Sequence, residues 1–68
     1  MDMRKLVGRN VRAARVERGM TQERLAEVSG FSQQYISDLE RGRRNPTIVS
    51  LYELAQALSA TPIELLKP

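Results

Sequence analysis

The stretch that decides the fold is TQERLAEVSGFSQQYISDLERG, residues 21–42. It holds two short helical patterns, and each follows a residue that favours the start of a helix, Thr21 or Ser32. Gly30 separates the two patterns and supplies the backbone freedom that a tight reversal requires. Because the joint around Gly30 is so short, the two helices must meet at a sharp angle. This geometry predicts a helix-turn-helix over residues 22–41.

Three further helices are predicted around this pair. Residues 3–18 form an amphipathic pattern, with apolar side chains on one face and cations on the other. A helix over residues 48–58 follows an Asn-Pro break and a Thr cap, and a last short helix begins at Pro62. No stretch shows the alternation of a β-strand. We therefore expect an all-α, compact five-helix bundle that forms a single domain over residues 1–68.

The composition excludes several classes of chemistry. The 68 residues include no Cys and no His, so disulfides, Ser–His and Cys–His nucleophile pairs and ordinary zinc sites cannot be built. No run approaches the ~18 consecutive apolar residues of a membrane span, and the N-terminal residues lack the apolar core of a secretory signal. We expect a cytoplasmic protein that is not an enzyme and that has no metal, no cofactor and no membrane contact.

The positive charge is concentrated in two segments. Residues 1–20 carry six cations and two anions, and residues 41–44, RGRR, carry three cations. Nine of the eleven cations are Arg, whose planar fork suits phosphates and base edges better than Lys does. Lys5, Arg9 and Arg12 also fit an ordinary solvated helix face. Charge alone therefore does not separate a nucleic-acid ligand from a basic surface.

The second helix of the pair, predicted over residues 33–41, has an anchored side and a polar side. Ile36 and Leu39 fall on the side expected to be buried. The other side is a contiguous panel of hydrogen-bonding side chains: Gln33, Gln34, Ser37, Asp38 and Arg41. An α-helix fits the major groove of duplex DNA, where Gln pairs with adenine and Asp accepts from cytosine. The panel favours base reading, although ordinary surface helices also have a polar side.

The same stretch, with its surroundings, resembles the phage-repressor-like helix-turn-helix family of lambda repressor and Cro, often called Xre. The resemblance extends from about Val7 to Leu66. The motifs that carry it are the Arg-x₃-Gly-Met-Thr-Gln run from Arg15 to Gln22, Leu25-Ala26, Gly30, Ile36, the run from Ser37 to Gly42, and Pro46-Thr47. The resemblance implies that the helix over residues 33–41 is a recognition helix that reads DNA.

Roles follow for individual polar residues. The residues expected to read bases are Gln33, Gln34, Ser37 and Asp38. The residues expected to contact DNA phosphates are Thr21, Gln22, Tyr35, Arg41, Arg43, Arg44 and Asn45. The resemblance also implies that Gln22 braces the recognition helix and that Arg15 and Glu40 form a largely buried ion pair. For Asp38 an alternative stays open, which is an ion pair with Arg41 three residues on.

The C-terminal segment TPIELLKP holds more apolar residues than one domain face needs. Leu65 is expected to close the core, which leaves Ile63 and Leu66, with the outer edge of the preceding helix, for a two-fold homodimer contact. Such a dimer places two recognition helices about one DNA turn, ~34 Å, apart. We therefore predict a sequence-specific transcriptional regulator that reads a near-palindromic operator in double-stranded DNA. The alternative is a protein-interaction or antitoxin-type module that uses the helix-turn-helix as a scaffold.

Overall fold

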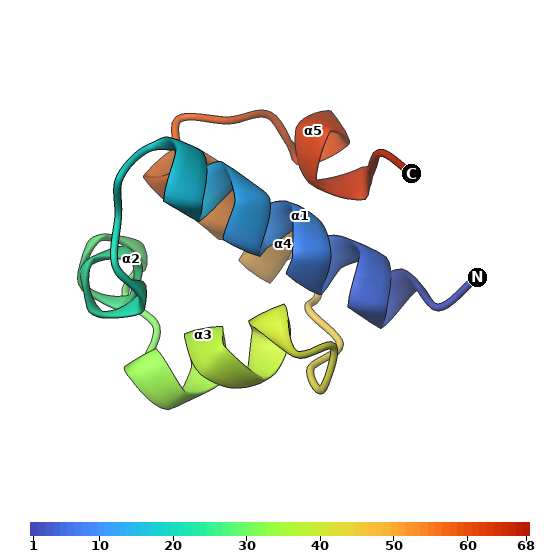
Figure 1. The fold of residues 1–68 in the computed structure, drawn as a ribbon, viewed down its shortest axis with the longest axis horizontal. Coiled ribbons are helices and arrows are strands. Elements are labelled where there is room, and N and C mark those ends of the chain that lie inside the picture. Colours follow the sequence, from blue (N-terminus) through green and yellow to red (C-terminus); the bar gives the residue numbers. More distant parts are fainter.

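The computed structural model describes all 68 residues, which form five α-helices and no strand (Figure 1). The helices are α1 (Met3–Glu17), α2 (Gln22–Ser29), α3 (Gln33–Glu40), α4 (Ile48–Ala57) and α5 (Pro62–Leu66). In the view of Figure 1, α1 lies in front of α4, α3 lies along the lower edge and α5 along the upper edge. The predicted all-α fold with a helix-turn-helix is confirmed. None of the helices is both long enough and apolar enough to cross a membrane.

A side-chain cap begins every helix. The capping residues are Asp2, Thr21, Ser32, Thr47 and Thr61, and each accepts a hydrogen bond from a backbone N–H of the first turn. These bonds satisfy donors that have no partner within the helix. The caps expected at Thr21, Ser32 and Thr47 are confirmed, because capping depends on residue type and near neighbours alone.

Three helices end in the same hydrogen-bonded reversal, in which the residue that follows the C-cap adopts a left-handed backbone conformation. Gly19 takes this position after α1 and Gly42 takes it after α3, whereas Ser59, with φ 53°, takes it after α4. The last residues predicted for these helices are cap residues instead: Arg18, Arg41 and Leu58. Each helix is therefore one residue shorter than the sequence pattern indicates.

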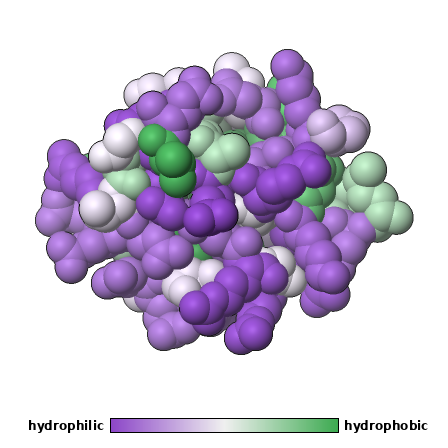
Figure 2. Space-filling view, viewed as in Figure 1, coloured by the Kyte–Doolittle hydropathy of each residue, from purple (hydrophilic) through white to green (hydrophobic).

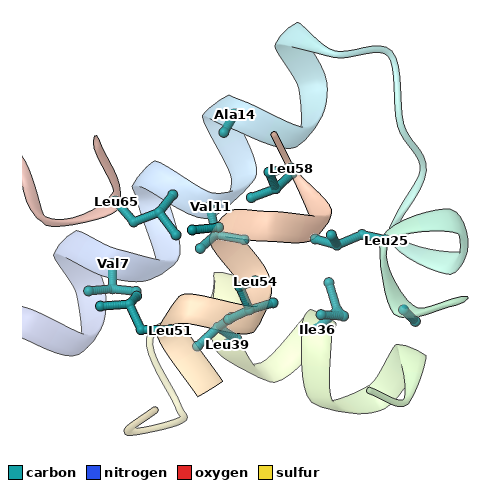
Figure 3. Close-up of a cluster of buried hydrophobic side chains, with 12 residues drawn as sticks. Val7, Val11, Ala14, Leu25, Ile36, Leu39, Leu51, Leu54, Leu58 and Leu65 are labelled. Atoms are coloured by element: carbon teal, nitrogen blue, oxygen red, sulfur yellow. The ribbon is translucent and has the colours of Figure 1, made fainter. Parts of the chain in front are cut away.

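One apolar core joins all five helices (Figure 3). Ile36 and Leu39 of α3 are fully buried in it, as predicted, and each contributes about 1.5–3 kcal/mol of burial free energy. Leu65 of α5 is fully buried as well, which confirms that it closes the core. The apolar side of α3 is thus anchored, and its polar side must face outward.

The backbones of α1 and α3 meet closely at Gly8. A Cβ atom at Gly8 would lie 2.3 Å from the carbonyl oxygen of Leu39 and 3.0 Å from that of Glu40. Only glycine allows this approach. No sequence signal pointed to Gly8, because it lies inside an amphipathic helix and marks no turn. The contact sets how closely the end of α3 sits against α1.

Candidate nucleic-acid interface

The polar side of α3 is open to solvent. Gln33 and Gln34 are exposed, and Ser37 and Asp38 are partly exposed. Figure 2, drawn in the same orientation as Figure 1, shows a mainly hydrophilic surface along the edge where α3 lies. The structure therefore places the four residues expected to read bases together on one accessible side of a helix whose other side is held in the core.

The residues expected to contact phosphates come before, within and after α3 in the chain. They begin α2, belong to α3 or follow it: Thr21, Gln22, Tyr35, Arg41, Arg43, Arg44 and Asn45. Arg41 and Arg43 are exposed and form no ion pair within the chain. Their guanidinium groups are therefore free to meet an external anion, and Asn45 is exposed beside them.

An ion pair beneath the surface connects α1 to the end of α3. Arg15 donates from Nε to Glu40 Oε2 at 2.7 Å and from Nη2 to Glu40 Oε1 at 3.1 Å. The Glu40 side chain is only 4% exposed. Arg15 Nη1 also donates to the backbone carbonyl of Met20 at 2.8 Å. Such forked, hydrogen-bonded geometry is what allows a charge pair to be kept out of water.

Gln22 joins this network from the start of α2. Its Nε2 donates to Glu40 Oε1 at 3.1 Å, and its side chain is partly buried. Glu40 therefore accepts hydrogen bonds from two other helices, which fixes the end of α3 relative to both. This contact is the bracing that the resemblance implies for Gln22.

Asp38 makes two contacts across the polar side of α3. Its Oδ1 accepts from Gln34 Nε2 at 2.9 Å, and its Oδ2 lies 3.7 Å from Arg44 Nη2. The Arg44 guanidinium also lies over the Tyr35 ring, 5.2 Å from the ring centroid. The alternative ion pair of Asp38 with Arg41 is wrong. The chain reverses directly after α3, so that Arg44 returns to Asp38 while Arg41 stays exposed.

Tyr35 is half-buried and connects the surface of α3 to the turn before it. Its ring stacks on Phe31, with centroids 4.5 Å apart and an angle of 15° between the planes. Both rings pack against the apolar core. The Tyr35 hydroxyl makes no hydrogen bond within the chain, so it is available to an external acceptor.

Exposed apolar side chains gather on α4 and α5. Ile63 is 71% exposed and Leu66 is 40% exposed. On α4, Ile48, Val49 and Tyr52 are also exposed. Leu66 and Ile48 line the same surface hollow, so apolar surface of the two helices is continuous there.

Asn10 of α1 binds the C-terminal end of α5, a role that no sequence pattern indicates. Its Nδ2 donates to the backbone carbonyl of Leu65 at 2.9 Å and to that of Lys67 at 2.7 Å. Carbonyl groups at the end of a helix have no partner within it. Asn10 satisfies the carbonyl of Leu65, together with that of the cap residue Lys67, and thereby holds α5 in place.

The sequence matches the model of a helix-turn-helix family (HTH_3) over residues 11–66. The chain belongs to this helix-turn-helix family. It is 63% identical over 68 residues to the HTH-type transcriptional regulator y4dJ of Sinorhizobium fredii, an alignment that covers 100% of this chain and 88% of that protein.

Two solved structures resemble this helix-turn-helix protein throughout. One is a hypothetical transcription factor, NHTF, from Neisseria, with a TM-score of 0.93 and 36% identity, covering 98% of this chain and 77% of that one. The other is the restriction-modification controller protein C.AhdI from Aeromonas hydrophila, with a TM-score of 0.88 and 39% identity, covering 91% and 94% of the two chains. The predicted family resemblance is confirmed.

Proposed function

We propose that this helix-turn-helix protein is a sequence-specific transcriptional regulator that inserts α3 into the major groove of double-stranded DNA. The observation that supports this most strongly is the two-sided environment of α3, which is anchored by buried Ile36 and Leu39 and open along its polar side. A single α-helix fits the major groove, where each base pair presents a distinct pattern of donors and acceptors. The relatives named as transcriptional regulators and as a controller protein favour the same function.

Base reading divides between two kinds of residue on α3. Gln33 and Ser37 make no side-chain hydrogen bond within the chain, so all their donors and acceptors are available. Gln33 can therefore pair through two bonds with adenine. Gln34 and Asp38 are bonded to each other and meet DNA as a unit.

Phosphate contacts set the register of the protein on DNA and supply salt-dependent affinity. Arg41 and Arg43 are the available cations next to α3, because they follow this helix and neither has a carboxylate partner. Thr21, Asn45 and the Tyr35 hydroxyl add uncharged contacts. Gln22 keeps its second amide hydrogen for a phosphate while it holds Glu40.

The apolar surface of α4 and α5 supports a homodimer. Ile63 and Leu66 lie three residues apart on α5 and share one side of that helix, and Ile48 extends the surface onto α4. A two-fold contact here would place two α3 helices about one DNA turn, ~34 Å, apart, to read a near-palindromic operator. Sedimentation equilibrium should show a dimer at tens of micromolar, and a monomer at every concentration would contradict this part of the proposal.

Selection of bound duplexes from a random DNA pool tests the function directly. We expect one near-palindromic motif to be enriched, with the operator bound at least ~10³-fold more tightly than random sequence. Binding should weaken steeply with salt, because each phosphate contact contributes a slope of about −0.9 in log K against log salt concentration.

Failure to enrich any motif would instead support a protein-interaction module that uses this fold as a scaffold. The proposal also includes a cytoplasmic location, where duplex DNA is reachable, and a role without catalysis.

A further inference from the structure

Asp38 is an anion placed within a strongly cationic surface. The loop after α3 carries three Arg within four residues, and phosphates repel a carboxylate at this position. The side chain of Asp38 is nonetheless only 22% exposed, because both of its oxygens are engaged within the chain. Its two partners are Gln34, which the proposed function assigns to base reading, and Arg44 of the cationic loop, which the family resemblance assigns to phosphate contact.

Arg44 has two partners within the chain, unlike the other cations of its loop, which form no ion pair. Its Nη2 lies 3.7 Å from Asp38 Oδ2, and its guanidinium lies over the Tyr35 ring. Tyr35 itself stacks on Phe31 and packs on the core, so it offers a fixed platform. Arg43 is its neighbour in sequence and has no ion-pair partner.

We infer that Asp38 is a specificity-determining residue that acts by withholding Arg44 from DNA phosphates. This inference rests on the proposed function. A guanidinium paired with a carboxylate adds no net charge, so a complex in which the pair stays intact neutralises one phosphate fewer. The affinity that this phosphate contact would supply is lost for every DNA sequence. On the operator the loss is offset, because Asp38 also orders the side-chain amide of Gln34 for contact with a base.

The backbone allows the side chain of Asp38 to be tested without moving the loop. The N–H of Arg43 donates to the backbone carbonyl of Asp38 at 2.9 Å, and Gly42 provides the left-handed turn between them. Neither feature depends on the carboxylate. Asp38→Asn, which keeps the shape of the side chain and removes its charge, should therefore leave the fold and the loop in place.

The experiment measures binding to a random-sequence duplex as a function of salt concentration. Asp38→Asn should steepen the slope of log K against log salt by about 0.9 and raise the affinity roughly five- to tenfold at 0.1 M salt. The double variant Asp38→Asn/Arg44→Ala should return to the wild-type slope. Asp38→Asn should also lower the ratio of operator to random-sequence affinity.

Glu17→Gln is the matched control. Glu17 is exposed at the end of α1 and makes no ion pair, so the change removes the same charge away from α3 and should leave the slope unchanged. Circular-dichroism melts establish that each variant is folded, and Asp38→Ala provides a second variant with the same expectation.

Two results would overturn the inference while leaving the proposed function intact. In the first, the wild-type protein selects a motif, but the slope of log K against log salt for Asp38→Asn equals that for Glu17→Gln. The other is a steeper slope that persists in the double variant, because Arg44 is then not its source. Absence of salt-dependent DNA binding by the wild-type protein would instead reject the proposed function and the inference with it.

Discussion

Arg15 on α1 and Glu40 at the end of α3 form a two-bonded ion pair, with 2.7 Å between Arg15 Nε and Glu40 Oε2. Replacement of Arg15 by Ala would leave a nearly buried carboxylate without its cation. We expect Arg15→Ala to lower the free energy of unfolding by about 3–5 kcal/mol, as measured by urea denaturation. Base preference of the folded fraction should not change.

Arg18→Ala is the control for this prediction. Arg18 pairs with Glu64 at 3.4 Å, and both side chains are more exposed than those of the buried pair. Its removal should cost only about 0–1 kcal/mol. Equal losses for the two variants would show that the Arg15–Glu40 pair is not a structural element.

Gly8→Ala should destabilise the protein even though it improves helix propensity. The new methyl group would meet the Leu39 carbonyl at 2.3 Å, and such overpacking costs about 1–3 kcal/mol. Ala13 is exposed on the same helix, so Ala13→Gly reports the propensity effect alone, which is about 1 kcal/mol. A more stable Gly8→Ala variant in thermal melts would disprove the close contact of α1 with α3.

Ser59→Gly should stabilise the protein. Ser59 has a left-handed backbone with φ 53°, a conformation that costs an L-residue about 1–2 kcal/mol. Part of that gain is lost to the greater freedom of glycine in the unfolded chain, so a net increase of about 0.5–1 kcal/mol is expected. Ser59→Ala keeps the strain and should give no such increase in the same denaturation experiment.

Asn10→Ala should loosen α5. The change removes the donor to the carbonyls of Leu65 and Lys67, and carbonyl groups left without a partner cost about 1–3 kcal/mol. Because α5 carries Ile63 and Leu66, the proposed dimer should weaken as well. Sedimentation equilibrium at matched concentrations measures the dissociation constant of the dimer. An unchanged dissociation constant would show that the dimer contact does not involve α5.

Local signals predicted most of the fold. The caps at Thr21, Ser32 and Thr47 and the buried positions Ile36 and Leu39 depend on residue type and helical period, which a single sequence contains. The sequence pattern places the ends of three helices one residue too late, because it does not show where the backbone turns left-handed.

Contacts between distant segments were harder to predict. Arg15 and Glu40 were paired only through family resemblance, and Asn10 contacts carbonyls more than 50 residues away in sequence. Gly8 lies inside α1 and marks no turn, so the neighbouring sequence does not predict its close contact with the end of α3. Helical spacing offers Arg41 as an alternative partner for Asp38, whereas the reversal at Gly42 brings Arg44 to it instead.

The most direct test of base reading by α3 compares wild-type protein and Gln33→Ala on the selected operator and on its single-base variants. Gln33 is exposed and has no partner within the chain, so its loss should leave the fold intact. We predict that discrimination relaxes by about 1–3 kcal/mol at one base pair of each half-site and stays unchanged elsewhere. Uniform weakening on every sequence would contradict the claim that the polar side of α3 reads the major groove.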